Sequence, residues 1–449
     1  MTSGEAGDGA RPEPALVHSR AVMEALFGAP AERPFDVAYW NGFVERGRDA
    51  SASFGLVVRR PGALRRMLLP PSELSIVEAF LSGDVDVEGD LESAVTLGDA
   101  INTRLKAART LAEVTRHLLA LPRGDAPDVR EARAVETVGK AGARHEKSRD
   151  RSAIQYHYDV GNDFYALWLD ERLVYSCAYF ASPTQSLEDA QVAKLDLVCR
   201  KLRLREGERL LDVGCGWGAL VIYAAREYGA SALGITLSDA QAELARERVA
   251  KAGVADRVRI EMRDYRDLAG ESFDKIASVG MVEHVGVANL PVYFAALHRA
   301  LEPGGLFLNH GIVGLNAARP IGLREQLERR LWRRDAFIDQ YVFPDGKLGP
   351  LHTVIAAAEG AGFETRDVES LRDHYTLTLR EWLRRLRRNA DRAIRVTNER
   401  IFRTWLLYMT GAAHGFASGR LNVVQTLLAK PDATGNARLP LRRFGSAQS

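Results

Sequence analysis

A glycine-rich segment at residues 212–218 has the residue types and spacing to hold a nucleotide-like ligand. It reads D-V-G-C-G-W-G, comes after an apolar run and precedes a helical pattern. Glycines let the backbone pass close to a flat, partly charged ligand, and the next helix offers unpaired N–H groups. The glycines fall at 214, 216 and 218, which is the spacing of neither a dinucleotide site nor a P-loop. The alternative is a tight turn that binds nothing.

Residues further along the chain favour S-adenosylmethionine as the ligand. An NAD site normally has an acid after the second strand, whereas "GITLSDAQ" offers the hydroxyls of Thr236 and Ser238 and the amide of Gln241. A third strand runs into "RDYRDL", where Asp264 has two interpretations: it accepts a hydrogen bond from an amine such as that of adenine, or it caps a helix. The short D-x-G-x-G-x-G form matches the S-adenosylmethionine loop of Rossmann-like methyltransferases.

The elements that must position these residues alternate between strand and helix. Strands are expected at 209–214, 230–237, 258–264, 273–280 and 304–313, with helices between them. The alternation predicts an α/β fold of the Rossmann-like, class I methyltransferase type, with a doubly wound, mostly parallel sheet. The next region, residues 316–430, is strongly basic, rich in Trp and Tyr, and expected to be largely helical, with helical lipid-binding insertions.

A small α+β domain is expected before this unit. Residues 51–60 and 63–69 look like strands, and residues 72–83 look like a helix capped by Ser72. The predicted organisation is a disordered tail at 1–15, an accessory domain at 16–140, the methyltransferase domain with its C-terminal lipid-binding part at 141–430, and a tail at 431–449.

Composition limits the remaining classes of function. The chain has 449 residues and a formal net charge of +2, so bulk charge gives no case for nucleic acid. Its three cysteines cannot form a disulfide framework and fit no zinc pattern, so no metal is expected. The N-terminus has no signal-peptide pattern, and no run of about 18 apolar residues could span a membrane. We therefore expect a cytoplasmic protein.

An aromatic segment, "IQYHYDVGNDFYALWLDERLVYSCAYF" at residues 154–180, precedes the first strand. Burial in a core is the ordinary use of any single ring. Together with "MVEHVG" at residues 281–286, however, the segment has a more specific meaning.

The combined motifs resemble those of the cyclopropane-fatty-acyl-phospholipid synthase family, which includes the mycolic acid cyclopropane synthases and methyltransferases. They are H-Y-D-x-G-N-D-F, Y-S-C-A-Y-F, D-V-G-C-G-W-G, T-L-S-x-x-Q, D-Y-R-D and V-G-M-V-E-H-V-G. The similarity runs from about Tyr156 to about Arg420. Members that act on phospholipid carry an N-terminal module that the mycolic acid members lack, which points to a membrane lipid as substrate.

The resemblance implies a set of site residues. A bicarbonate ion beside the sulfonium would act as general base, held by Cys177 and Ile312 through their backbones and by Glu283, His310 and Tyr375. S-adenosylmethionine would contact Tyr175, Ser176, Gly214, Cys215, Gly216, Thr236, Leu237, Ser238, Gln241, Asp264 and Tyr265. One departure is "MTGAAHGF" at 409–416, which has alanines where other members have a cysteine once considered as a nucleophile. A homodimer is expected from the family alone.

Physical chemistry gives these groups a purpose. An isolated alkene is a poor nucleophile, so an activated methyl group must be held close to it and in line. Methyl transfer leaves a carbocation, which a dry pocket protects and which aromatic faces stabilise by roughly 0.5–2 kcal/mol each. Ring closure needs a base, and Glu283, a neutral His310 and Tyr375 could position an anion there or act directly. Taken singly, Glu283 could be an ordinary cap residue and His310 a core histidine.

Two basic stretches, at 324–334 and 380–395, indicate contact with anionic headgroups at the inner face of the membrane. A solvated helix face with salt bridges to its neighbours is the alternative. The apolar residues that could share a helix face are Leu327, Leu331 and Phe337 in one case and Trp382, Leu383 and Leu386 in the other.

The leading hypothesis is a phospholipid cyclopropane synthase, which adds a methylene group from S-adenosylmethionine to a cis double bond of an unsaturated acyl chain. The same scaffold could give a methyl-branched or exomethylene chain if the proton leaves a neighbouring carbon. A methyltransferase for a soluble small molecule and a non-catalytic lipid-binding protein are the further alternatives.

Overall fold

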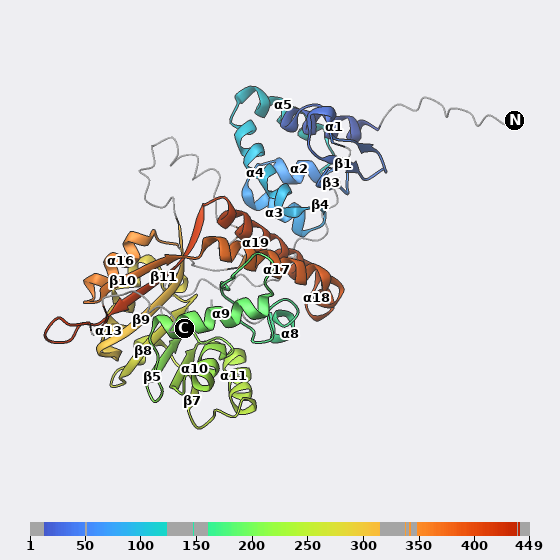
Figure 1. The fold of residues 1–449 in the computed structure, drawn as a ribbon. Coiled ribbons are helices and arrows are strands. Elements are labelled where there is room, and N and C mark those ends of the chain that lie inside the picture. Colours follow the sequence, from blue (N-terminus) through green and yellow to red (C-terminus); the bar gives the residue numbers. More distant parts are fainter. Residues whose placement is uncertain are drawn as a thin grey trace. The chain divides into compact units, whose positions relative to one another are not determined.

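The chain forms two compact units, residues 1–135 with 321–337 and residues 136–320 with 338–449 (Figure 1). The computed structural model describes residues 13–49, 52–123, 147, 160–314, 337, 341–342, 348–437 and 439–440. Most of the tail predicted at 1–15 lies outside the described residues, but Pro14 already begins a helix. The predicted domain boundaries stay predictions.

The N-terminal unit has a four-stranded sheet in the order β2-β1-β3-β4. Its described elements are α1 (Pro14–Phe27), β1 (Asp36–Tyr39), β2 (Val44–Glu45), β3 (Phe54–Val58), α2 (Ala63–Leu68), α3 (Glu73–Leu81), β4 (Val85–Gly89), α4 (Leu91–Leu105) and α5 (Ala108–Ala120), with a 3-10 turn at Pro30–Glu32. The α+β prediction is confirmed, and Ser72 caps α3 by accepting a hydrogen bond from the Ser75 amide at 3.0 Å.

One predicted strand of this unit is wrong. Residues 63–69 form helix α2 rather than a strand. Leu64, Met67 and Leu68 are buried, and their spacing of three and four residues places them on one helical face. The run "ALRRMLL" is too short for its period to be read from the sequence, because a helical turn and a strand both fit so few apolar residues.

The second unit is built on a seven-stranded sheet in the order β10-β11-β9-β8-β5-β6-β7. Its described strands are β5 (Arg209–Val213), β6 (Ser231–Thr236), β7 (Val258–Met262), β8 (Phe273–Val279), β9 (Leu301–Gly314), β10 (Glu364–Ser370) and β11 (Leu421–Ala429). Strands β5 to β9 are parallel, whereas β11 runs antiparallel to β9 and β10. The mostly parallel, doubly wound sheet is confirmed, and each of the five predicted strands is present.

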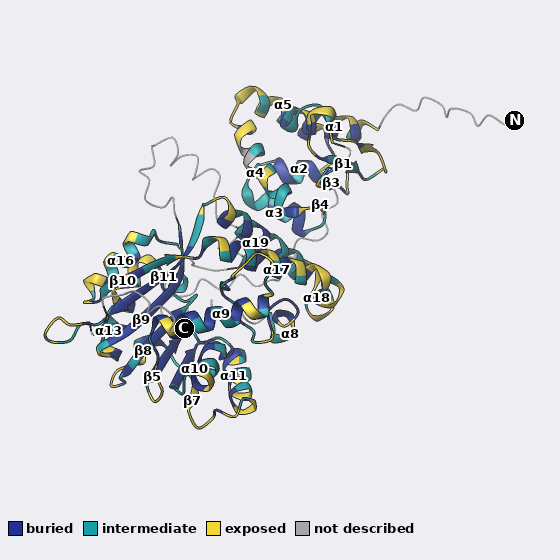
Figure 2. Cartoon of the chain, in the orientation of Figure 1, coloured by how far each residue is buried: buried dark blue, intermediate teal, exposed yellow. Residues whose placement is uncertain are grey.

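Helices cover both faces of this sheet. They are α8 (Asn162–Tyr165), α9 (Leu187–Lys201), α10 (Ala219–Glu227), α11 (Asp239–Lys251), α12 (Val282–Val285), α13 (Leu290–Ala300), α16 (Leu351–Gly360), α17 (Arg372–Arg388), α18 (Ala390–Val396) and α19 (Glu399–Ala417), with 3-10 turns at Tyr265–Asp267 and Val287–Asn289. Successive strand residues point to opposite faces, so Leu210 packs with α9, α10 and α11 while Leu211 packs with α13 and α16. Strands β5, β6, β8, β9 and β11 are accordingly mostly buried, whereas β10 at the edge of the sheet is mostly half-buried (Figure 2).

The described part of 316–430 is largely helical, as expected, but it also contains two strands that were not predicted. Strands β10 and β11 lie in this region and extend the sheet beyond β9. Seven of the nine residues of β11 are buried, so its sequence has no alternation between apolar and polar residues to mark it as a strand. Residues 315–336, which include Leu327, Leu331 and the basic stretch 324–334, lie outside the described residues.

An aromatic core lies between the 164–180 segment and helices α17 and α19. The Trp382 ring is fully buried and lies 5.4 Å from the rings of Trp168 and Tyr175, centroid to centroid. Leu386 is also fully buried, so the apolar side of α17 faces the protein core and not a lipid surface. Arg385 on the same helix binds Glu188 at 2.8 Å, as in the salt-bridged alternative.

Helices in the described ranges include none that is both long enough and apolar enough to cross a bilayer.

Replacing Trp382 tests whether α17 is held by this core. Trp382→Ala removes a fully buried ring, so we expect the free energy of unfolding to fall by about 3–5 kcal/mol in urea denaturation. Arg388→Ala, at an exposed position near the end of α17, should change it by less than about 0.5 kcal/mol. Equal, small effects would mean that the Trp382 side of the helix is not a core face.

Candidate functional site

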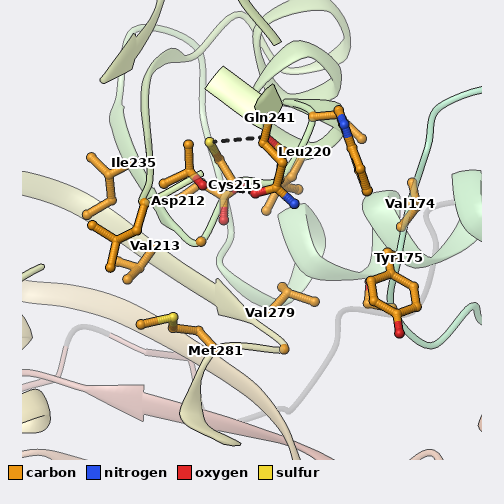
Figure 3. Close-up of a pocket in the computed structure, with 18 of the residues that line it drawn as sticks. Val174, Tyr175, Asp212, Val213, Cys215, Leu220, Ile235, Gln241, Val279 and Met281 are labelled. Carbon is orange, nitrogen blue, oxygen red and sulfur yellow. Dashed lines mark hydrogen bonds between the residues drawn. The ribbon is translucent and has the colours of Figure 1, made fainter. Parts of the chain in front are cut away.

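A pocket opens at the carboxyl ends of the parallel strands, where open α/β sheets bind their ligands. Val174 and Tyr175 lie on the opposite side of it from Asp212, Val213 and Ile235 (Figure 3). Ten of the eleven predicted S-adenosylmethionine contacts line it: Tyr175, Ser176, Gly214, Cys215, Gly216, Thr236, Leu237, Gln241, Asp264 and Tyr265. The fold therefore brings together residues that are up to about 90 positions apart in the sequence.

The glycine segment turns sharply between β5 and α10. Gly214, Gly216 and Gly218 have φ values of +82°, +52° and +82°, in the region that favours glycine. The Gly214 and Cys215 amides donate to the Ile235 carbonyl at 2.9 and 3.0 Å, which fixes the loop to the end of β6. The backbone thus passes along the pocket without side chains at 214 and 216.

Two polar side chains line the pocket, Thr236 at the end of β6 and Gln241 in the first turns of α11. The Thr236 hydroxyl donates to the Gln241 side-chain oxygen at 2.9 Å, and both residues are buried. Ser238 does not line the pocket; its hydroxyl accepts from the Gln241 amide at 3.3 Å and caps α11. Ser238 therefore shapes the turn that presents Gln241.

Asp264 caps the 3-10 turn at Tyr265–Asp267, which is one of the two roles predicted for it. Its carboxylate accepts from the Arg266 amide at 2.8 Å and pairs with the Arg266 guanidinium at 2.6 Å. It also lines the pocket. The capping bond and a contact with a ligand amine are compatible, since a carboxylate has about four lone-pair sites.

Glu283 does not line the pocket, but it lies in the chain between two residues that do. The Ile312 amide on β9 donates to Glu283 Oε1 at 2.7 Å, and Met281 and His284 on either side of Glu283 line the pocket. The residue as a whole is half-buried, but its Oε2 atom is enclosed and has no hydrogen-bond partner among the residues that the structure describes. Burial raises the pKa of Glu283 to about 7, so its protonated and ionised forms are both accessible near neutrality.

His310 lies two residues before Ile312 on the same strand and is buried. Its Nδ1 atom lies 3.2 Å from Gln425 Nε2 on β11. Since an amide nitrogen can only donate, this arrangement makes Nδ1 the acceptor and leaves the proton on Nε2. Burial lowers the pKa of His310 to about 3, so the ring is neutral, as expected from the sequence.

Cys177 and Tyr375 lie in the aromatic core and not in the pocket wall. The Cys177 thiol is within 3.2 Å of the Ala178 carbonyl, and burial raises its pKa, which keeps it protonated. Tyr375 on α17 packs against Phe416 at a centroid distance of 4.7 Å. Ile312 packs against the same core and also binds Glu283, so it connects the core to the carboxyl.

Sequence reasoning missed three charged residues of the pocket wall, Lys194, Asp212 and Arg263, of which the first two are buried. Lys194 is 2% exposed and Asp212 is 3% exposed. A lysine at the core-facing position of "QVAKLDLV" is the signal that could have found the first. Asp212 is the acid of the D-x-G-x-G-x-G pattern itself, where it serves only to identify the loop.

Solved structures and curated relatives agree with this geometry. The chain has a TM-score of 0.57 and 35% identity with the mycolic acid cyclopropane synthase CmaA1 complexed with SAH and CTAB, covering 62% of this chain and 97% of that one. Cyclopropane mycolic acid synthase 1 from Mycobacterium tuberculosis is 36% identical over 61% of this chain and 94% of its own length. A probable fatty acid methyltransferase from Pseudomonas putida is 40% identical over 91% of this chain and 95% of its own length.

The fold and pocket define a class I, S-adenosylmethionine-dependent methyltransferase. More particularly, the chain belongs to the mycolic acid cyclopropane synthetase family, whose model matches residues 145–426. The resemblance drawn from the sequence motifs is therefore confirmed.

The buried Oε2 atom of Glu283 predicts a pH-dependent effect of Glu283→Gln. Burial disfavours the ionised form of Glu283 in the folded state, so its folded pKa of about 7 lies above the ordinary value of 4.5. The free energy of unfolding of the wild type, relative to that of the variant, is therefore highest below pH 4.5 and falls as the pH rises through about 7. Going from about pH 5 to about pH 8, we expect the variant to gain about 2 kcal/mol over the wild type in urea denaturation. Glu359→Gln, at an exposed position on α16, should show no such trend. A difference that does not change with pH would contradict the assigned burial.

Proposed function

We propose that this protein is a phospholipid cyclopropane synthase. In this reaction the methyl carbon of S-adenosylmethionine becomes the third ring atom across a cis double bond of an unsaturated acyl chain. The observation that carries the proposal is the position of the Glu283 carboxyl group next to residues of the cofactor pocket. The Ile312 amide holds one carboxyl oxygen, and the other oxygen is enclosed and has no hydrogen-bond partner among the residues that the structure describes.

The pocket has suitable groups for S-adenosylmethionine. The loop at 214–216 leaves room for the ligand along the backbone, while Thr236, Gln241 and Asp264 offer polar atoms for its ribose and adenine. S-adenosylmethionine supplies an activated methyl group when it is bound. Tyr175, on the opposite wall, also packs in the aromatic core, so the pocket and that core share a wall.

The residues around Glu283 also fit a bicarbonate ion. A buried oxygen without a partner is costly, and a protonated Glu283 could donate from Oε2 to an anion. The neutral His310 has its Nε2 proton available on the same strand as Ile312. We propose that the ion is held by Glu283, His310 and Tyr375 with the backbones of Cys177 and Ile312, where it would supply the general base.

The reaction conserves atoms and electrons. The alkene carbon bonds to the methyl carbon while the carbon–sulfur bond breaks, which leaves a carbocation in the acyl chain. The new methyl group then loses a proton to the base, and the freed electron pair closes the ring. The aromatic core beside the pocket would keep water away from the cation, and each ring face near a cation is worth roughly 0.5–2 kcal/mol. Glu283 and His310 hold the proton acceptor.

Membrane phospholipid is the substrate that the chain length favours. The relative named for mycolic acid cyclopropanation matches 61% of this chain, whereas the fatty acid methyltransferase relative matches 91% and so includes much of the N-terminal unit. We propose that the protein is cytoplasmic and that its basic side chains bind the anionic headgroups on the inner face of the membrane. Exposed Arg384, Arg387 and Arg388 on α17 are basic groups that suit such docking. A homodimer stays a prediction.

A second product is possible in the same site. The P. putida relative is named a fatty acid methyltransferase. If a hydride shifts from the methyl-bearing carbon to the cation, loss of a proton from the new methyl group gives an exomethylene chain. Loss of a proton from a neighbouring chain carbon instead gives a methyl-branched alkene. The position of the base relative to the cation decides between these outcomes.

Mass spectrometry of acyl chains tests the proposal. The full chain, S-adenosylmethionine and vesicles of unsaturated phospholipid should yield acyl chains heavier by one CH₂ unit, with a higher rate when bicarbonate is added. Because Glu283 holds the base, Glu283→Gln should lower the rate by roughly 10²–10⁴-fold. Glu359→Gln serves as the matched control and should leave the rate unchanged.

Mild hydrogenation identifies the product. A ring resists it, whereas an exomethylene chain takes up hydrogen and would support the second product. A protein that binds the cofactor but adds no mass to any phospholipid would contradict the lipid proposal.

A further inference from the structure

Gln425 is a fully buried amide side chain on β11. It lies directly opposite His310 on the neighbouring strand β9. Its Nε2 atom donates to His310 Nδ1 at 3.2 Å, while its Oε1 atom is enclosed and has no hydrogen-bond partner among the residues that the structure describes. A buried polar side chain is costly to keep, and the contact with His310 is the feature of its surroundings that gives Gln425 a purpose.

The orientation of this amide follows from its surroundings. Turning it round would place Nε2 at the enclosed position that Oε1 now has, where the described residues offer it no acceptor. Buried N–H groups without a partner are rarer than buried carbonyl oxygens without one. The orientation with Nε2 against His310 is therefore favoured.

His310 lies where the cofactor pocket meets the aromatic core. Val279 on β8 lies opposite it, the Gly280 amide donates to the His310 carbonyl at 2.9 Å, and both of these neighbours line the pocket. His310 and Ile312 are two residues apart, so their side chains lie on the same face of β9. Because Ile312 packs against the aromatic core, the His310 ring lies on the face of the sheet that carries this core.

The imidazole ring of His310 carries a single proton. Burial and the positive charges of Lys194 and Lys201 lower its pKa, which disfavours a second proton. A ring nitrogen that accepts a hydrogen bond cannot hold the proton, so the contact with Gln425 assigns it to Nε2. The N–H group at Nε2 suits an anion, whereas the other tautomer would present a lone pair there and repel one.

We infer that Gln425 is a positioning residue, which holds His310 in the tautomer that donates a hydrogen bond from Nε2 to an anionic base. The inference rests on the proposed function, in which His310 helps to hold bicarbonate. Gln425 does not line the pocket and acts through the histidine. Without its amide the ring proton is free to move to Nδ1, and the anion then loses one of its donors.

Nitrogen NMR spectroscopy of the full chain, labelled with ¹⁵N-histidine, tests the tautomer directly. The signals of His310 are those that disappear in His310→Asn, since the chain has 10 histidines. In the wild type we expect the proton on Nε2, and in Gln425→Met, which has a similar length but no donor, we expect it to be shared with Nδ1. A wild type with the proton on Nδ1 would overturn the inference, whether or not the variant folds.

Thr426→Val is the matched control for this measurement. Thr426 is the next residue of β11, is also buried and points to the opposite face of the sheet. Its hydroxyl has no hydrogen-bond partner among the described residues, so removing it should leave the tautomer of His310 and the reaction rate unchanged. The same shift of the proton in Thr426→Val would show that any change in β11 moves it, and would overturn a specific role for Gln425.

The acyl-chain assay tests whether the tautomer matters for the reaction. Gln425→Met should lower the rate by about 10- to 100-fold, the size of effect seen when the partner that orients a metal-bound histidine is removed. It should also raise the bicarbonate concentration needed for half the maximal rate and leave the KM for S-adenosylmethionine unchanged. In a His310→Asn background it should have little further effect, because it acts through the histidine.

The outcomes separate this inference from the proposed function. A wild type that adds CH₂ to phospholipid, with Gln425→Met as active and as dependent on bicarbonate, would overturn the inference and leave the proposed function intact. An equal loss of rate from Gln425→Met with and without His310 would also overturn it, since the residue would then act on structure alone. A wild type that adds no mass to any phospholipid would overturn the proposed function and the catalytic role of this tautomer with it.

Discussion

The hydrogen bond from the Ile312 amide to Glu283 is the constraint on which the rest of the site depends. It holds a carboxyl group where its ionisation is disfavoured, and leaves its second oxygen without a partner among the described residues. The bond needs α12 to lie directly on β9. Gly311 permits this contact, because a Cβ atom at that position would overlap the Val282 side chain. A short helix, one glycine and one strand amide thus hold this carboxyl group in place.

The sheet adds the remaining parts around this bond. Parallel strands bring the glycine loop, Thr236 and Asp264 to one edge, which is the ordinary place for a ligand in such folds. The antiparallel strand β11 extends the sheet past β9 and places Gln425 against His310. Helices α17 and α19 then close an aromatic core over the same region. The cofactor pocket and the aromatic core are therefore supplied by different elements that meet at β9.

Much of this could be predicted from the sequence, because its signals are local. The loop at 212–218 comes after a buried strand, and five strands have apolar runs with helices between them. Strand β11 could not be found in this way, since it is largely buried and lacks alternation. The apolar side of α17 looks like a lipid contact in the sequence for a related reason: an amphipathic pattern does not tell a core from a membrane. The position of Lys194 in the pocket wall is hard to predict from the sequence, because the other residues of that wall lie far away along the chain.

A crystal structure of the full chain with S-adenosylhomocysteine and bicarbonate tests the central claim most directly. We predict the adenosine beside Thr236 and Gln241, the homocysteine sulfur toward α12, and an anion that receives a hydrogen bond from Glu283 Oε2. A structure in which Glu283 is solvated or bonded only to protein groups, with the sulfur facing away from it, would contradict the proposed role of this carboxyl.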